Sequence, residues 1–162
     1  MSDDHRVQPV YILYHKKKQE IQPLLDKIFI QYNQKADSKD LYLNTVKTDA
    51  TAVFDEKWTL EALCNIVDNA IKYTVTGGIS INVIVYEFFV RIDISDTGIG
   101  ISDNEHEKVF SRFYRSEKVN TTEGVGIGLY LARKIITGEN GYIKVSSLPE
   151  HGSTFSVFLS KL

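Results

Sequence analysis

The chain has 162 residues, of which 43% are hydrophobic and 25% are charged, so it is long enough for one globular domain with its own core. Its formal net charge of −2 at pH 7 gives no electrostatic reason to expect a nucleic acid partner, and its single cysteine, Cys64, rules out an internal disulfide. No apolar run approaches the roughly 20 residues that cross a membrane, and no signal peptide is visible.

The first third of the chain predicts one helix and two short strands. Residues 1–14 begin polar and become briefly apolar, and we expect them to be the remnant of a linker. Apolar residues at helical spacing predict a helix over residues 15–34. Pro23 lies inside this pattern, which favours a helix start near Pro23. Alternating apolar and polar side chains predict a strand over residues 39–46, and a second short strand follows over residues 50–54.

The stretch Glu61–Thr74 is predicted to be the central helix of the domain, with Asp55 as its cap. One side of this helix is apolar, and the other carries a polar stripe made of Glu61, Asn65, Asp68, Asn69 and Lys72. The amide oxygens of Asn65 and Asn69, one turn apart, can share a hard cation such as Mg²⁺, and Lys72 can contact a phosphate. A merely solvated helix face is the alternative interpretation.

A β-hairpin follows, predicted by two β-rich runs over residues 79–86 and 88–95. In the second run, one face is shared by Phe88, Val90, Ile92 and Ile94, and Asp96 continues the same alternation. A carboxylate directed toward the buried side must find a hydrogen-bond donor. The next residues, 97–100, form a glycine-containing turn where the backbone can come close to a ligand, although a strand-ending Asp that caps a turn is the simpler alternative.

The last third predicts a short helix over residues 102–113 and then a stretch without regular pattern as far as residue 123. Long irregular segments inside a compact domain are usually functional or mobile. The glycine-rich run 124–128 opens a helix over residues 129–137, and a helix N-terminus with free N–H groups favours phosphate. This glycine spacing fits neither a Rossmann fingerprint nor a P-loop. The chain closes with a predicted hairpin over residues 142–147 and 153–159.

Four of these stretches together resemble the N box, first glycine box, F box and second glycine box of the ATP-binding catalytic domain of sensor histidine kinases. The matching segments are NIVDNAIKY (65–73), DTGIG (96–100), FSRFYR (110–115) and GVGIGL (124–129). Gyrase-type and chaperone ATPases belong to the same superfamily. The resemblance implies an α+β fold of Bergerat type over residues 15–162: a two-layer α/β sandwich whose mixed, mostly antiparallel sheet has helices on one face, with a mobile ATP lid over about residues 101–125.

The resemblance also implies roles for the residues of the central helix and the strand that ends at Asp96. Asn69 and Asn65 would hold the Mg²⁺ that bridges the phosphates of ATP, and Lys72 would contact a phosphate directly. Tyr73 would pack along the adenine or ribose. Asp96 would accept the amino group of adenine, which would exclude guanine because guanine has a carbonyl there.

The remaining site residues come from the glycine boxes and the lid. The residues implied to contact ATP through these segments are Gly98, Gly100, Ile101, Arg115, Gly124, Gly126, Gly128 and Leu129. Arg115 would meet the γ-phosphate when the lid closes, and Phe110 and Phe113 would anchor the lid. Ser153 would lie near the adenine. Glu61 matches a position where many relatives carry an acid, which would polarise the attacking group, and an ordinary surface acid is the alternative. The implied catalytic set is Glu61, Asn65, Lys72 and Arg115.

The implied activity is transfer of the γ-phosphate of ATP to a histidine of a partner domain. None of the four histidines of this chain, at 5, 15, 106 and 151, lies in a phosphoacceptor pattern, so the chain would hold only the donor half. We expect it to be a piece of a longer kinase, and an acceptor on another protein is the alternative. Its partners would be a phosphoacceptor histidine domain and a downstream response regulator, with no nucleic acid. The chain would be the cytoplasmic, cytosolic portion of a membrane-associated bacterial sensor kinase.

Three other functions share parts of this pattern. An ATP-hydrolysing conformational machine of the same superfamily would use Glu61 to activate water, although the F box is a kinase feature. A serine kinase of the anti-sigma type would phosphorylate a small partner protein. A non-enzymatic nucleotide-sensing module would bind ATP without transferring phosphate.

Overall fold

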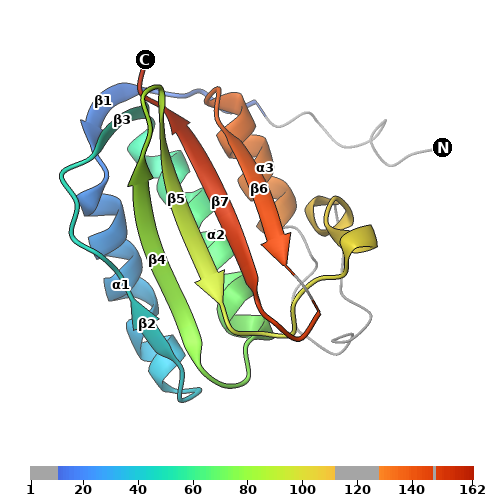
Figure 1. Cartoon of the computed structure of the whole chain (residues 1–162). Coiled ribbons are helices and arrows are strands. Elements are labelled where there is room, and N and C mark those ends of the chain that lie inside the picture. Colours follow the sequence, from blue (N-terminus) through green and yellow to red (C-terminus); the bar gives the residue numbers. More distant parts are fainter. Residues whose placement is uncertain (1–10, 112–127, 148) are drawn as a thin grey trace.

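The computed structural model describes residues 11–111, 128–147 and 149–162. A five-stranded sheet with the strand order β2-β4-β5-β7-β6 forms one layer, and α1, α2 and α3 cover one of its faces (Figure 1). The helices are α1 (Gln22–Asp37), α2 (Glu56–Tyr73) and α3 (Gly128–Gly138). The strands of the sheet are β2 (Tyr42–Asn44), β4 (Gly78–Val85), β5 (Phe89–Asp96), β6 (Tyr142–Ser147) and β7 (Ser153–Ser160). Within these described ranges, no helix combines the length and the apolar character that crossing a membrane requires.

The sheet is mixed and mostly antiparallel, as predicted. Strand β2 pairs in parallel with β4, whereas the pairs β4–β5, β5–β7 and β6–β7 are antiparallel. Alternation along the strands places their apolar residues on the helix-covered face, where Ile81, Ile92 and Val157 are almost completely buried. The predicted two-layer sandwich is therefore confirmed, with the hydrophobic core between the sheet and the helices.

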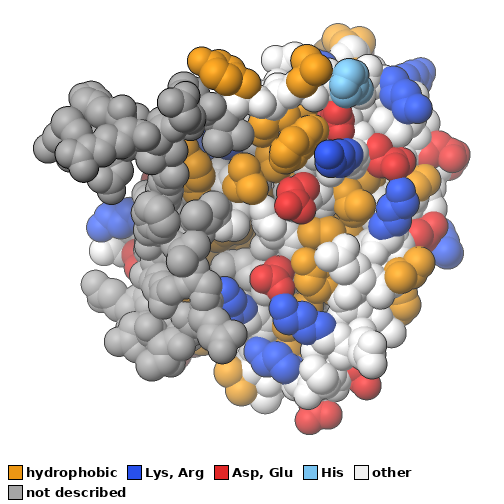
Figure 2. Space-filling view, turned by 180° about the vertical axis from the view of Figure 1, so that it is seen from behind, with side chains coloured by type: hydrophobic (Ala, Val, Ile, Leu, Met, Phe, Trp, Pro, Cys, Tyr) orange, Lys and Arg blue, Asp and Glu red, His pale blue; other side chains and the backbone are white. Residues whose placement is uncertain are grey.

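The central helix α2 begins at Glu56, directly after the predicted cap Asp55, and contains all but the last residue of the predicted stretch Glu61–Thr74. The predicted cap is present, because the Asp55 carboxylate accepts a hydrogen bond from the backbone N–H of Trp58 at 2.9 Å. The apolar side of the helix is buried through Ala62, Leu63, Cys64, Ile66, Val67, Ala70 and Ile71. The outer surface of the helical layer carries charged side chains of both signs among apolar ones (Figure 2).

Two predicted helices differ from the structure. Residues 17–20, inside the first predicted helix, form strand β1 (Lys17–Glu20), which pairs with β3 (Thr51–Phe54) in a separate two-stranded sheet. Helix α1 starts at Gln22 with Pro23 in its first turn, where proline is tolerated, which agrees with the expectation that this helix starts near Pro23. The helix predicted over residues 102–113 is replaced, in its described part, by two short 3₁₀ turns, η2 (Asp103–Glu105) and η3 (Lys108–Phe110).

The segment before β1 is hydrogen-bonded to the N-terminal cap of α2 and to the C-terminal end of α3. The buried Glu139, directly after α3, accepts hydrogen bonds from the Asp55 backbone N–H and the Thr59 hydroxyl, both at 2.6 Å. The backbone N–H of His15 donates to the Asp55 carboxylate at 2.7 Å, and the Tyr14 hydroxyl donates to the carbonyl of Ile135 in α3 at 3.0 Å. Burial raises the pKa of Glu139, and the bonds that it accepts oppose this shift.

Candidate functional site

The C-terminal half of α2 presents the predicted polar stripe, in which Asn65, Asn69 and Lys72 are all half-buried. The cap and the buried apolar side of α2 fix the direction of these side chains, because residues four apart lie one turn apart on the same face. Asp68, the acid in this stripe, forms an ion pair with Lys35 of α1, so its position is explained by a contact within the protein. Glu61, one turn before Asn65, is exposed.

The first glycine box lies against the C-terminal end of α2. A methyl group added at Gly98 would be 2.5 Å from the carbonyl oxygen of Tyr73 and 3.1 Å from the hydroxyl of Thr74, so only glycine fits at this position. The loop is also held by Thr97, whose hydroxyl accepts from the backbone N–H of Gly78 at 3.0 Å and donates to the carbonyl of Thr76 at 2.7 Å. The two predicted boxes are therefore in direct contact.

Asp96 lies at the end of β5 and continues the buried face of Val90, Ile92 and Ile94, as its phase predicted. Its carboxylate accepts the backbone N–H of Gly98 at 2.8 Å and is also hydrogen-bonded by the backbone of Ser153. Burial raises the pKa of Asp96, and these two amides oppose that shift by favouring the charged form. A half-buried carboxylate has further lone pairs with which it can accept a hydrogen bond from a ligand.

The end of the second glycine box lies against the N box. Gly128, the first residue of α3, would place an added methyl group 3.7 Å from Cβ and 3.9 Å from Cγ of Asn65. The side chain of Leu129 is only 7% exposed and belongs to the hydrophobic core, which leaves its backbone as the part that could face a ligand. Gly124, Gly126 and Arg115, also predicted to contact ATP, lie outside the described residues.

Helix α2 thus connects two groups of predicted residues. Asp96, Gly98 and Tyr73 meet at its C-terminal end, and Asn65 meets Gly128 two turns earlier. Asn69 lies between them, one turn from Asn65 and one turn from Tyr73. The arrangement can therefore accept a polar base at one end and anionic groups at the other.

The start of the predicted lid is fixed by two contacts. Phe110 of the F box is 5% exposed and packs edge-on against Phe155, with ring centroids 5.9 Å apart. The guanidinium of Arg133 lies over the same ring, 4.8 Å from its centroid. Gly100 has a φ of +75°, which favours glycine, and the next residue, Ile101, is half-buried. Phe113 and the rest of the lid, residues 112–125, lie outside the described part of the chain.

Three hydroxyl side chains at this site were not predicted. Thr74 donates to the carbonyl of Ala70 at 2.7 Å beside Gly98, and Thr97 holds the glycine loop as described above. Ser147 accepts the backbone N–H of Ile101 at 2.6 Å. Ser147 could have been found by working out the register of the closing hairpin, because it pairs with Ser153 across the two strands.

The donor set suits a magnesium ion that is held mainly by a nucleotide. Within the part of the chain that the structure describes, no group of three or more His, Cys, Asp or Glu residues could hold a metal alone. The amide oxygens of Asn65 and Asn69 are hard donors on one face of α2. Magnesium is commonly bound by one or two protein oxygens together with substrate phosphates, so these residues fit the ion.

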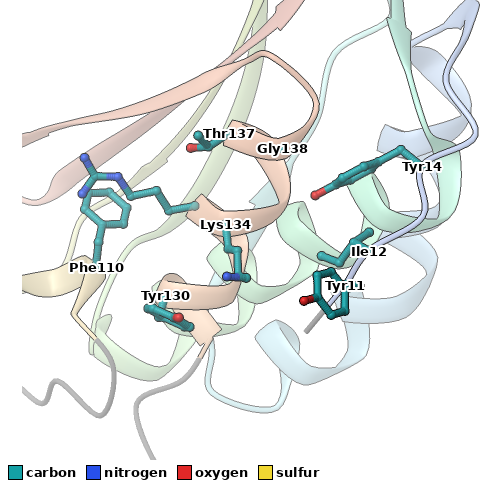
Figure 3. A pocket seen from close by; sticks show the side chains of 9 residues that line it. Tyr11, Ile12, Tyr14, Phe110, Tyr130, Lys134, Thr137 and Gly138 are labelled. Carbon is teal, nitrogen blue, oxygen red and sulfur yellow. The ribbon is translucent and has the colours of Figure 1, made fainter. Parts of the chain in front are cut away.

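A hollow of about 550 Å³ lies elsewhere, on the outer side of α3 (Figure 3). Its lining comes from the N-terminal segment, from η3 and from α3: Tyr11, Ile12, Tyr14, Phe110, Tyr130, Arg133, Lys134, Thr137 and Gly138. None of these lining residues belongs to the predicted ATP-binding set, so this hollow is separate from the site around α2.

Known proteins resemble this chain in sequence. The family model described as histidine kinase-, DNA gyrase B-, and HSP90-like ATPase matches residues 54–162. The adaptive-response sensory kinase SasA of Microcystis aeruginosa is 36% identical over 145 residues, which are 87% of this chain and 38% of that protein. The sensor-like histidine kinase SenX3 of Mycobacterium tuberculosis is 32% identical over 150 residues, which are 88% of this chain and 36% of that protein. The chain spans little more than a third of the length of these relatives.

Solved structures share the fold. The catalytic domain of histidine kinase ThkA superposes with a TM-score of 0.77 at 24% identity, covering 91% of this chain and 98% of that chain. Full-length ShkA in complex with AMPPNP gives a TM-score of 0.82 at 22% identity, covering 91% of this chain and 31% of that chain. Both similarities extend over nearly the whole chain, in agreement with the predicted sandwich.

Proposed function

The chain belongs to the family of histidine kinase-, DNA gyrase B- and HSP90-like ATPases, and we propose that it is the ATP-binding catalytic domain of a two-component sensor histidine kinase. The observation that carries this proposal is the meeting of Asp96, Gly98 and Tyr73 at one end of the helix that brings Asn65 against Gly128. The sensory and histidine kinases among the sequence relatives support the same class.

The base of ATP would be read by Asp96. Its carboxylate is held by the amides of Gly98 and Ser153 and would accept a hydrogen bond from the exocyclic amino group of adenine. Guanine carries a carbonyl at that position, which would leave two acceptors facing each other. Tyr73 would pack along the adenine or ribose, while Gly98, Gly100 and Ile101 would let the loop backbone come close to the base.

The phosphates would lie along the polar stripe of α2. Asn65 and Asn69 would hold Mg²⁺, which when bound neutralises charge on the phosphate oxygens. Lys72 and Arg115 would contribute positive charge, and backbone amides would contact the phosphates from the second glycine box, at Gly124, Gly126, Gly128 and Leu129. Phosphoryl transfer depends more on such positioning and charge stabilisation than on covalent chemistry by the enzyme.

The acceptor would be a histidine of a phosphoacceptor domain in the full-length protein. A neutral imidazole nitrogen would form the new N–P bond with its lone pair while the bond from the γ-phosphorus to the bridging oxygen breaks, and ADP would leave. The other ring nitrogen would then lose its proton to solvent. Glu61 would help to polarise the attacking ring. A response regulator would take the phosphoryl group, and the domain would be the cytosolic part of a membrane-associated kinase.

Two measurements test this proposal. Titration of the chain with ATP and GTP, with and without Mg²⁺, should give Mg²⁺-dependent binding that prefers ATP. A phosphoacceptor domain from a related kinase, supplied in trans with labelled ATP, should become labelled in an acid-labile, base-stable form. Acid-stable labelling would favour a serine kinase, and steady hydrolysis of ATP by the chain alone would favour a conformational ATPase.

A further inference from the structure

The first glycine box is tied to the connection between β6 and β7 at two points. The backbone N–H of Ile101 donates to the Ser147 hydroxyl oxygen at 2.6 Å, and the backbone N–H of Glu150 donates to the carbonyl of Ile99 at 2.5 Å. These bonds hold the residues that directly follow Asp96 in the chain. The position of the loop therefore depends on a hairpin more than 45 residues further along the chain, since Ile101 and Ser147 are 46 positions apart.

The Ser147 hydroxyl makes two further hydrogen bonds, which together with the bond from Ile101 fill its donor and acceptor positions. Its oxygen lies 2.8 Å from the carbonyl of Gly152 and 3.0 Å from the hydroxyl oxygen of Ser153. A hydroxyl has one hydrogen to donate and two lone pairs to accept with. Ser147 therefore donates to Gly152 while it accepts from Ile101 and from Ser153. One small side chain at the end of β6 thus links the loop at Ile101 to the start of β7 at Gly152 and Ser153.

Gly152 and Ser153, which are hydrogen-bonded to Ser147, also contact Asp96. Gly152 has a φ of +80°, and a methyl group added there would lie only 2.1 Å from the carbonyl oxygen of Asp96. The next residue, Ser153, pairs with Asp96 across β5 and β7, and its backbone is hydrogen-bonded to the Asp96 carboxylate. A shift at Ser147 must consequently move the groups that aim this carboxylate.

We propose that Ser147 is a positioning residue for base recognition, holding Ile101 on one side and Gly152 and Ser153 on the other so that Asp96 faces the amino group of adenine. This inference rests on the proposed function of the domain. Ser147 acts through the Asp96 carboxylate and the loop after it. Its loss is therefore expected to weaken recognition of the base more than binding of the phosphates.

The test compares three variants of the whole chain. Ser147→Ala removes the three hydrogen bonds of the Ser147 hydroxyl, and Ser147→Thr keeps a hydroxyl at this position. Ser146→Ala changes the neighbouring exposed serine of the same strand. Ser147→Ala should raise the Kd for ATP by about three- to tenfold, the usual effect of one lost hydrogen bond, and should bring the affinities for ATP and GTP closer together. Ser147→Thr should keep most of the ATP affinity and most of the preference for ATP over GTP, and Ser146→Ala should behave as wild type.

Amide hydrogen exchange of the nucleotide-free protein supplies an independent readout. The Ile101 N–H should exchange faster in Ser147→Ala than in wild type, and it should not exchange faster in Ser147→Thr or Ser146→Ala. An unchanged ATP affinity and ATP-to-GTP ratio in Ser147→Ala would overturn this inference. Equal weakening of both nucleotides together with a lower Tm would overturn it as well, because that outcome describes a general loss of stability. Failure of the wild-type chain to bind ATP would instead overturn the proposed function, and this inference with it.

Discussion

Replacement of Gly98 by alanine should damage both the stability of the domain and its affinity for ATP. The added methyl group would lie 2.5 Å from the carbonyl oxygen of Tyr73 and 2.9 Å from the Asp96 carboxylate. Both atoms belong to groups that cannot swing away, since one is helix backbone and the other is held by two amides. The loop would have to retreat by roughly 1 Å, and forcing extra volume into a packed site costs about 1–3 kcal/mol.

The same movement would lengthen the 2.8 Å hydrogen bond between the Gly98 N–H and Asp96. Because a misplaced carboxylate cannot meet the base, we expect the Kd for ATP to rise about tenfold or more in addition to the loss of stability. Urea unfolding followed by tryptophan fluorescence measures the first effect, and competition with a fluorescent ATP analogue measures the second.

Gly128→Ala is the matched control. The nearest atoms to a methyl group at Gly128 belong to Asn65 and lie 3.7 Å or more away, which is ordinary van der Waals contact. Alanine also favours helix over glycine by up to about 1 kcal/mol. This variant should be at least as stable as wild type. If Gly98→Ala matched wild type in both unfolding free energy and ATP affinity, the contact between the glycine loop and the end of α2 would be wrong.

Three further predictions concern single side chains. Asp96→Asn should reduce the preference for ATP over GTP by about tenfold in competition binding, because the charged acceptor is lost; an unchanged preference would remove Asp96 from base recognition. Asn69→Ala should abolish most of the gain in ATP affinity that Mg²⁺ provides, and the same gain in variant and wild type would contradict a metal-binding role. Burial raises the pKa of Glu139 above its ordinary value of about 4.5, so the folded state holds the proton more tightly than the unfolded state does. The free energy of unfolding should therefore decline as pH rises above about 4.5 and Glu139 ionises. Glu139→Gln, which cannot ionise, should flatten this decline. Urea unfolding at several pH values checks this, and parallel curves for both proteins would refute it.

The sequence was most informative where structure depends on neighbours in the chain. The central helix, the phase of Asp96 and the cap at Asp55 follow from local spacing, and the structure agrees with all three. Lys17–Glu20 has no apolar alternation, and it becomes a strand only because β3, more than 30 residues later, supplies its partner.

The same reason explains what was missed at the site. Ser147 acquires its role from Ile101 and Gly152, which no local pattern connects to it. The prediction of one helix over residues 102–113 rests on apolar spacing and on Ser102 or Asp103 as its N-cap. In the structure the Ser102 hydroxyl bonds to the side chains of Asn104 and Glu105, which favours a tight turn over a continuing helix.

The attachment of the chain before β1 has a mechanical consequence. Tyr14 is bonded near the end of α3 and His15 at the start of α2, whereas the opposite ends of these two helices carry Gly128 and Tyr73. Because a helix is stiffer than a loop, a displacement of the segment before β1 would be transmitted along α2 and α3 toward the candidate site residues at their other ends.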